Sequence, residues 1–191
     1  KYHQRGVLNE EMRELILMNV RRRDRAAGDL EAQLSACRVG VKHIEEMLNR
    51  HGEATWQAAL DAIMDHTEAE ARAMVKRMPD GVYEAEDFAE GVQAPGWTGD
   101  PVPLKVKVTI QDDQIHFDHA GTGAQTIGGI NCPLAVTCNS TWFTVKALTD
   151  ISIPINQGCY RPITIDAPLG SIVNCQFPAS VVSGNNETSP R

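Results

Sequence analysis

Apolar side chains in the first 80 residues recur at intervals of three and four positions, which is the spacing of one face of an α-helix. One such series runs through residues 24–50 and ends before Gly52, a residue type that commonly terminates helices. A second series covers residues 56–78 and stops at Pro79, and a shorter one covers residues 9–20. Because so few residues join the two long series, we expect an antiparallel helical hairpin with the apolar faces in contact. The face of the first helix comprises Leu30, Leu34, Cys37, Val41, Ile44 and Leu48.

In the second half of the chain, apolar side chains alternate with polar ones, which is the pattern of a half-buried β-strand. The alternation covers residues 104–110, reverses at Asp112-Asp113 and continues through residues 115–117, which predicts a β-hairpin. Residues 82–88 and 162–167 are expected to form further strands. A helix near Pro133 completes the pattern, with an apolar face made of Leu134, Cys138, Trp142, Val145 and Leu148.

Composition changes where the apolar period changes. Residues 1–80 contain 13 basic and 14 acidic side chains and one proline, whereas residues 81–191 contain 5 basic and 11 acidic side chains and nine prolines. Proline occurs far more often in loops and at the ends of strands than inside helices. We therefore predict an α+β fold with a helical module, residues 1–80, followed by a mixed α/β module, residues 81–191.

The whole chain of 191 residues carries a formal net charge of -7. Binding to a phosphate backbone requires the opposite sign, so we expect no nucleic-acid partner. No apolar stretch approaches the roughly 18 residues of a membrane span. The cysteines are odd in number and form no CxxC pair, which favours reduced thiols in a cytoplasmic protein over a disulfide framework or a zinc site. They are Cys37, Cys132, Cys138, Cys159 and Cys175.

His116, Asp118 and His119 form the one cluster of His and Asp residues in the sequence. On a strand, His116 and Asp118 share a face, and His119 can turn toward them at the strand end, so the three could bind a metal. A polar, solvent-facing edge of the hairpin explains the same residues. We favour that interpretation because such spacing often arises by chance, and we assign no metal ligands.

A glycine-rich loop, residues 121–129, precedes Asn131 and Cys132. Its backbone N–H groups could bind an anion, but it lacks the lysine of a P-loop and the acidic residue of a dinucleotide fold. A loop that permits close backbone approach is the better interpretation. Cys132, before a helix, and Cys159, near Arg161, are potential nucleophiles, although burial as small apolar residues is the simpler interpretation of both.

Two further polar features leave alternatives open. Arg161 could bind a carboxylate or phosphate through its planar guanidinium, or it could pair with Asp166 or with a carboxylate on a helix. Residues 184–189 combine a glycine with several hydrogen-bonding side chains. They form either a functional turn or a capping box at the start of a further helix.

Several segments along the chain have a recognisable order and spacing. They are residues 9–19, 28–33, 79–87, 118–125, 129–133, 158–163, 170–174 and 184–189. Taken together, these segments resemble an internal section of the subunits of the hydantoinase B/oxoprolinase family, which are several hundred residues long, and the resemblance covers essentially the whole chain. The chain departs from the family pattern at His119, where an aromatic residue is usual, at Asn186, where an aliphatic one is common, and at Pro190.

This resemblance implies ATP-dependent chemistry on unreactive carbonyl groups. Members hydrolyse cyclic amides such as hydantoins, oxoproline and lactams, and related large subunits carboxylate acetone or acetophenone. The resemblance further implies that ATP and Mg²⁺ bind to a hydantoinase A-type partner subunit in a hetero-oligomer. The family's divalent-metal ligands would lie N-terminal to Lys1, so this chain is expected to bind no cofactor itself and not to be active alone.

The resemblance identifies matched positions as substrate-binding or site-supporting residues without assigning a catalytic residue. Three functions stay open: part of an ATP-dependent cyclic-amide hydrolase, part of a ketone carboxylase, or a non-catalytic assembly segment. We expect two turns, residues 121–122 and 184–185, to line or support a small-molecule cavity. The matched positions are Asp118, Gly121, Thr122, Asn131, Arg161, Gly184, Asn185, Glu187 and Thr188.

Overall fold

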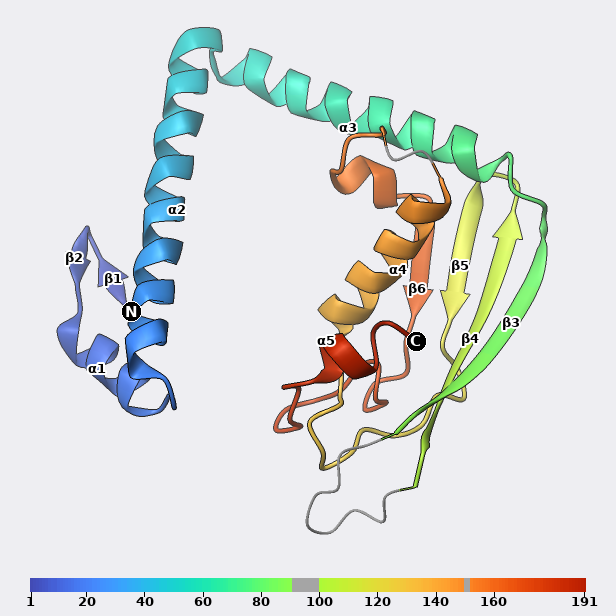
Figure 1. Ribbon diagram of the computed structural model, residues 1–191. Helices are drawn as coiled ribbons and strands as arrows, with labels where there is room; N and C mark the ends of the chain where they lie inside the picture. The colour runs from blue at the N-terminus through green and yellow to red at the C-terminus, as the bar shows by residue number, and fades with distance from the viewer. Residues whose placement is uncertain (91–99, 150–151) are drawn as a thin grey trace. The chain divides into compact units, whose positions relative to one another are not determined.

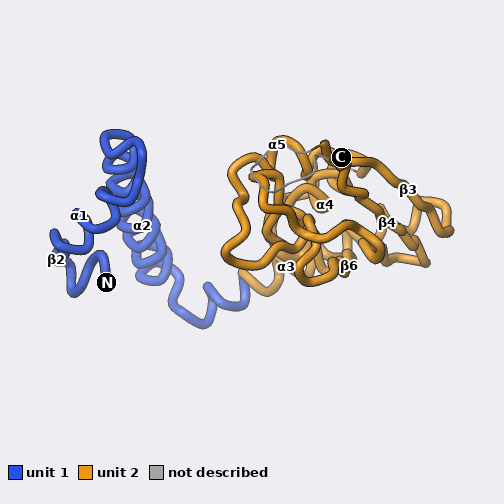
Figure 2. The backbone as a smooth tube through the Cα atoms, turned by 90° about the horizontal axis from the view of Figure 1, so that it is seen from below, with its two compact units in different colours: residues 1–59 blue, residues 60–191 orange. Residues whose placement is uncertain are grey.

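The computed structural model of the protein describes residues 1–90, 100–149 and 152–191. Contacts between residues divide the chain into two compact units, residues 1–59 and 60–191, which Figure 2 distinguishes by colour. Helices and a mixed sheet are both present, so the predicted α+β class is confirmed. The predicted domain division at residue 80 stays a prediction.

The first unit contains a short β-hairpin followed by helices (Figure 1). Asn9 begins the first helix, because its side-chain Oδ1 accepts a hydrogen bond from the backbone N–H of Met12 at 3.0 Å. Gly52, with a φ of +77°, ends the second helix and separates it from the third. The predicted helices are thus confirmed. The elements are β1 (His3–Gln4), β2 (Val7–Leu8), α1 (Glu10–Met18), α2 (Arg23–His51) and α3 (Glu53–Val75), and α3 continues into the second unit.

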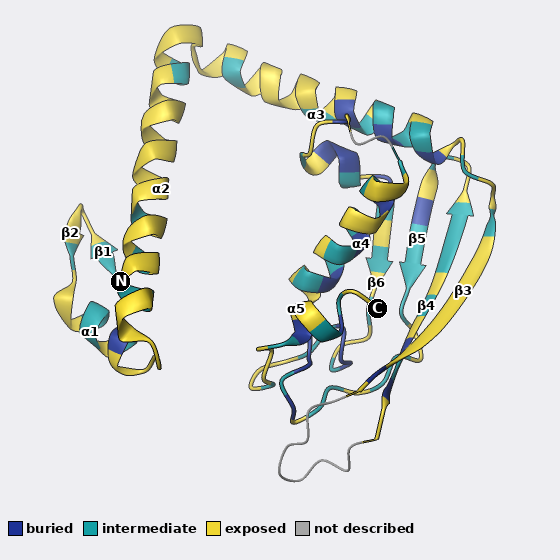
Figure 3. Ribbon diagram, in the orientation of Figure 1, coloured by how far each residue is buried: buried dark blue, intermediate teal, exposed yellow. Residues whose placement is uncertain are grey.

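Helix α2 has no buried residue, and Figure 3 colours most of it as exposed. Val41 and Ile44, on its predicted apolar face, are 56% and 48% exposed. The antiparallel pairing of α2 with α3 concerns both units and stays a prediction. Within the described ranges, no helix combines the length and the apolar character needed to cross a membrane.

The second unit is built around a four-stranded sheet in the order β3-β4-β5-β6. The first three strands are antiparallel, and β6 is parallel to β5. The predicted hairpin is confirmed, because β4 and β5 pair Ile110 with Ile115 around Asp112, whose φ is +53°. The elements are β3 (Gly81–Ala89), β4 (Val102–Gln111), β5 (Gln114–Asp118), α4 (Leu134–Leu148), the 3-10 helix η1 (Gln157–Tyr160), β6 (Ile163–Asp166) and α5 (Gly184–Glu187).

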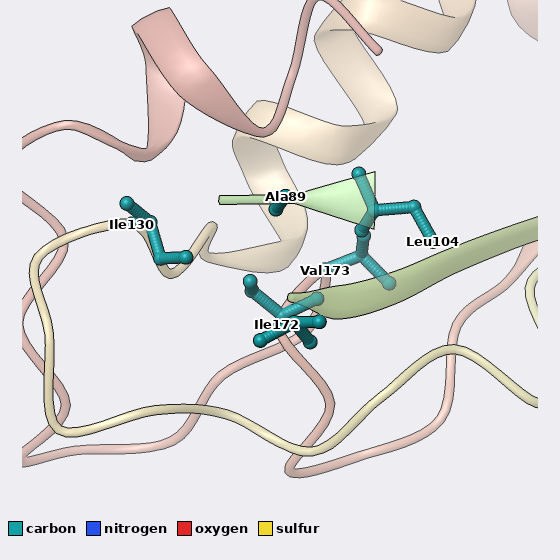
Figure 4. Packing of buried hydrophobic residues seen from close by; sticks show 6 residues of the cluster. Ala89, Leu104, Ile130, Ile172 and Val173 are labelled. Carbon is teal, nitrogen blue, oxygen red and sulfur yellow. The ribbon is translucent and has the colours of Figure 1, made fainter. Parts of the chain in front are cut away.

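Separate apolar clusters connect these elements. Val75 of α3, Ile115 of β5 and Val145 of α4 pack together, so the end of α3 and the middle of the sheet share a core with α4. A second cluster joins the adjoining ends of β3 and β4 to two loops, and Figure 4 shows its side chains. Its labelled members are Ala89, Leu104, Ile130, Ile172 and Val173.

The buried face of α4 differs from the predicted apolar face. Val145 is buried as expected, but Leu148 is 72% exposed, and Thr137 and Thr141 are buried instead. The hydroxyl of Thr137 donates a hydrogen bond to the carbonyl oxygen of Val173 at 2.6 Å, and that of Thr141 donates to the carbonyl of Thr137 at 2.9 Å. Because both hydroxyls are satisfied, the helix can bury them at low cost.

The segment before β6 packs directly on α3. A Cβ atom at Gly158 would lie 2.0 Å from the carbonyl oxygen of Met64, so only glycine fits there. Beside it, Asn156 donates from Nδ2 to the hydroxyl of the fully buried Thr67 at 2.9 Å. These contacts fix the start of β6 relative to the end of α3.

We predict that Gly158→Ala lowers the free energy of unfolding by about 3 kcal/mol, because the added methyl group overlaps the backbone of α3. Urea denaturation followed by circular dichroism measures the change. Gly28→Ala is the control: a Cβ there meets nothing within 4 Å, and alanine favours a helix over glycine by about 0.5–1 kcal/mol. Equal stability of the two variants would contradict the prediction.

Candidate active-site cavity

A cavity of about 220 Å³ lies between the sheet and α4 in the second unit. Its floor is apolar and is formed by Leu104, Val106, Phe117 and Val173. Asp87 of β3 and Arg191 of the C-terminal segment, which lie 3.9 Å apart, complete the wall as an oppositely charged pair. Glu86 and Lys105 also border the cavity, but their side chains alternate with those of the floor and pair with each other at 3.1 Å.

The wall opposite the sheet consists of hydroxyl groups along α4. Ser140 donates to the carbonyl oxygen of Thr137 at 3.0 Å, and Thr144 donates to that of Ser140 at 2.9 Å. Thr137 and Thr141 donate to carbonyl groups in the way described above. Each of these hydroxyl groups therefore donates its proton to a backbone carbonyl. Its oxygen can still accept a hydrogen bond from another molecule.

His119 closes the cavity next to the end of β5. Burial lowers the pKa of its imidazole below the usual value, against the smaller opposing effects of a hydrogen bond to the backbone of Lys105 and of the Asp118 charge. Its Nε2 atom is buried and has no hydrogen-bond partner among the described residues. Nε2 is thus a polar atom enclosed by the cavity wall, and burying it without a partner costs free energy.

Cys132 lines the same cavity as an inert thiol. Burial, with a smaller contribution from Cys175, raises its pKa to about 11, and its Sγ donates a hydrogen bond to the carbonyl oxygen of Gly184 at 3.0 Å. The thiol is therefore protonated at neutral pH, which argues against a nucleophilic role. Its burial agrees with the simpler of the two sequence interpretations.

The buried amide of Asn131 organises the loop next to the cavity. Its Oδ1 accepts from the backbone N–H of Thr126 at 2.7 Å, and its Nδ2 lies 2.8–2.9 Å from the carbonyl oxygens of Thr126, Gly128 and Ser180. The side chain is completely shielded from solvent. Asn131 therefore supports the cavity wall from behind and does not line it.

The C-terminal segment packs on this loop. A Cβ atom at Gly184 would lie 2.0 Å from the carbonyl oxygen of Asn131, so the two backbones are in direct contact. The hydroxyl of Thr188 donates to the carbonyl of Ile130, and Thr188 itself lines the cavity. The segment 184–189 thus begins with a short helix, α5, and the two residues that follow it, Thr188 and Ser189, border the cavity.

The turn after β5 is the second place where predicted site residues gather. Thr122 exchanges two hydrogen bonds of 3.0 Å with the backbone of Lys105, and Gly121 has a φ of +85°. Asp118 accepts from the backbone N–H of Ala120 at 2.9 Å, which lowers the pKa of its carboxyl group, and its Oδ2 lies 3.4 Å from Nζ of Lys107. These residues hold the strand end from which His119 enters the cavity wall.

Comparison with known proteins shows the family of the chain. The sequence model of the hydantoinase B/oxoprolinase family matches residues 1–191. The chain belongs to this family. It is 34% identical over 197 residues to the putative B-type subunit of the D-/L-hydantoinase of Pseudomonas sp. strain NS671, covering 97% of this chain and 33% of that protein. It thus spans about a third of that relative's length.

Two solved structures resemble the chain. The ATP-dependent caprolactamase of Pseudomonas jessenii is 28% identical with a TM-score of 0.79, and the match covers 93% of this chain and 30% of that one. Nucleotide-free acetone carboxylase superimposes with a TM-score of 0.82 at 20% identity, covering 97% and 26%. The second comparison shows a shared fold.

The remaining residues that match the family lie outside the cavity. Arg161 pairs through Nη1 with Asp65 and Glu68 of α3, at 2.8 Å each, so the structure selects the helix carboxylates among the predicted partners. Asn185 is exposed, and the carboxylate of Glu187 lies 3.9 Å from Arg191. The predicted binding or supporting roles of these residues stay predictions.

The His and Asp residues of the hairpin do not converge. His119 lies in the cavity wall, whereas Nδ1 of His116 is 2.9 Å from the hydroxyl of Thr164 and its Nε2 is 3.5 Å from Asp166. Within the described ranges, no group of three His, Cys, Asp or Glu side chains is placed to hold a metal ion. The divalent metal that the resemblance implies therefore does not fit these residues.

Sequence reasoning missed the hydroxyl-bearing wall of α4. The prediction followed the apolar residues of this helix, but four hydroxyl residues recur at helical spacing and mark a second face. That recurrence could have identified the cavity wall. The residues are Thr137, Ser140, Thr141 and Thr144.

We predict that Asn131→Ala lowers the free energy of unfolding by about 2–4 kcal/mol, because it leaves several buried backbone groups without their partner. Asn185→Ala is the matched control at an exposed position and should change stability by less than about 0.5 kcal/mol. Chemical denaturation of both variants gives the two values. A small effect at Asn131 would show that water replaces the amide.

We also predict that Cys132 resists alkylation. At pH 8 iodoacetamide should modify the exposed Cys37 within minutes and leave Cys132 largely unmodified, because the Cys132 thiol is buried and its pKa is about 11. Mass spectrometry of peptides from the folded protein measures both sites, and modification in urea provides the reference. Comparable rates at the two cysteines in the folded state would refute the inert-thiol assignment.

Proposed function

We propose that this chain is part of the B-type subunit of an ATP-dependent enzyme that hydrolyses cyclic amides. The observation that carries the proposal is the family match along the entire chain, together with relatives named as a hydantoinase component and as an ATP-dependent caprolactamase. A small-molecule cavity within the second unit supports the proposal.

The chemical problem in this reaction is the low reactivity of the amide carbonyl. ATP would supply a phosphoryl group to the carbonyl oxygen, and water would then add to the activated carbonyl carbon and expel the ring nitrogen, which opens the ring. A second water would cleave the resulting acyl phosphate into the acid and phosphate. In this proposal ATP and Mg²⁺ are held by a hydantoinase A-type partner subunit, and the divalent metal is bound outside these residues. The described residues contribute the walls of the substrate cavity. The wall formed by the sheet is apolar, and the wall formed by α4 carries hydroxyl groups.

The predicted site residues act in this proposal mainly as supports. Asn131 and Gly184 hold the loop that carries Cys132, and Thr188 joins that loop to the cavity. Asp118 and Thr122 hold the turn that positions His119. Such supporting contacts keep a binding site within the narrow geometry that catalysis requires.

The test is the substrate dependence of ATP consumption by the purified assembly that contains this chain. We expect ADP and phosphate to form together with a ring-opened acid when hydantoin, 5-oxoproline or caprolactam is supplied. Coupled spectrophotometry follows ADP, and mass spectrometry follows the acid.

The controls distinguish the alternatives. ATP consumption only with acetone or acetophenone plus bicarbonate would replace the proposal with a ketone carboxylase. If an assembly that lacks this chain kept its full activity, the chain would contribute nothing to catalysis. The non-catalytic assembly role would then replace the proposal.

A further inference from the structure

Strand β3 forms one edge of the four-stranded sheet and, among the described residues, pairs only with β4. Its residues from Val82 to Phe88 are all exposed, and Figure 3 colours nearly the whole strand accordingly. The pairing with β4 is continuous over the strand, which contains neither a bulge nor a proline. Bulges and prolines commonly prevent a further strand from adding to an edge. The free edge of β3, which is the side away from β4, can therefore accept another strand.

Alternate residues of β3 direct their backbone groups toward this free edge. The N–H of Lys105 in β4 donates to the hydroxyl of Thr122, and that hydroxyl donates to the Lys105 carbonyl oxygen, at 3.0 Å each. Lys105 therefore does not exchange hydrogen bonds with Glu86, the residue opposite it on β3. In an antiparallel pair the direction of the backbone groups alternates along the strand. The N–H and carbonyl groups of Glu86 thus face the free edge, and so do those of Glu84, two residues before it.

Phe88, two residues after Glu86, confirms this direction. Its N–H donates to Oδ1 of Asp87 at 2.7 Å, and its carbonyl oxygen accepts from Nη1 of Arg191 at 3.1 Å. The C-terminal segment thus occupies the last position of the free edge with a cationic side chain. The outward backbone groups of Val82, Glu84 and Glu86 bond to none of the described residues, so three positions of the edge stay open.

Charges on the face of the sheet turned away from α4 alternate in sign from strand to strand. Asp118 of β5 lies 3.4 Å from Lys107 of β4, and Lys107 is opposite Glu84 of β3. In the next row Lys105 pairs with Glu86 at 3.1 Å. A basic strand beside β3 would continue this alternation, whereas a second copy of β3 would bring glutamates next to glutamates. The edge therefore selects a basic strand and disfavours pairing with itself.

The length of the open edge indicates where such a strand comes from. A stable interface between separate proteins buries about 800 Å² on each partner, and three edge positions supply only a small part of that area. A strand of the same polypeptide needs much less area, because the connecting chain keeps it at a high local concentration. The hydantoinase relative has such additional polypeptide, since this chain covers 33% of its length.

We propose that the free edge of β3 receives an extended strand from the same B-type subunit, outside residues 1–191, with Lys or Arg next to Glu84 and Glu86. This strand becomes the fifth of the sheet and bonds to the backbone of Val82, Glu84 and Glu86. Because Ala85 and Asp87 of β3 line the cavity, the added strand also holds that wall in place. The inference rests on the proposed function, which makes the chain part of such a subunit.

Amide hydrogen exchange of the complete B-type subunit, resolved to single residues by fragmentation mass spectrometry, tests the proposal. The Ala85 amide is bonded to β4 and is protected whether or not the strand is present. We expect the amides of Glu84 and Glu86 to exchange at least about 100-fold more slowly than solvated amides, because the added strand bonds to that edge. Exchange of both at the solvated rate, with Ala85 protected, would overturn the inference.

The same measurement identifies the source of the strand. We expect the protection of Glu84 and Glu86 in the B-type subunit alone and at every protein concentration. Protection that appears only after the A-type subunit is added would assign the strand to that partner. Protection that increases with concentration would assign it to a second copy. Either result would overturn the proposed occupant.

Glu84→Lys tests the charge of the added strand. The variant brings a cation next to the proposed cation, so we expect the Glu86 amide to exchange about two- to fivefold faster. Asp166→Lys is the matched control, because it reverses a charge on the same face at the opposite edge, where the Asp166 side chain is 78% exposed. It should leave the exchange of Glu86 unchanged. Equal exchange of Glu86 in the two variants would overturn the basic character of the strand.

The outcomes separate this inference from the proposed function, because hydrogen exchange does not depend on activity. An open edge in an assembly that opens cyclic amides with ATP would overturn the inference alone. A protected edge in an assembly that does not hydrolyse cyclic amides would remove the proposed function alone.

Discussion

One buried amide group, that of Asn131, joins stretches of backbone that no regular secondary structure connects. It bonds to the loop before α4 on one side and to the backbone at Ser180 on the other. An apolar side chain of the same size could fill the space but could not satisfy these backbone groups, each of which is costly to bury alone. The hydrogen bonds of this amide therefore hold in place the cavity wall that contains Cys132 and Thr188.

The regular elements were predictable because their apolar periods are strong. The helices of the first 75 residues and the hairpin of β4 and β5 follow directly from spacings of three to four and of two. Helix α4 was predicted at the right place but with the wrong buried face, because its hydroxyls bond to backbone carbonyls and are buried at little cost. A sequence pattern that counts only apolar residues does not include these hydrogen bonds, so it cannot identify the buried hydroxyl face.

The sequence could identify a set of candidate residues for the site. It could not predict what each of them contacts or which of them line the cavity. The matched residues fall into two groups around the cavity and one arginine that pairs with two carboxylates of α3, and most of the first two groups contact backbone. Arg161 illustrates the limit, since its partners on α3 lie more than 90 positions away in the sequence. The sequence offered His119 only as a possible metal ligand, with a solvent-facing edge as the favoured interpretation, and the fold shows instead that its ring is part of a cavity wall.

The parallel pairing of β5 with β6 has a mechanical consequence. The chain leaves the sheet at Asp118, passes through α4 and returns to the neighbouring strand at Ile163, so α4 is tethered to the sheet at both ends. Helix α4 is thus the crossover of a β5–α4–β6 unit and lies over the face of the sheet that carries Ile115. Thr188 and Arg191 of the C-terminal segment border the cavity between this helix and the sheet, so the last residues of the chain complete a wall that the crossover begins.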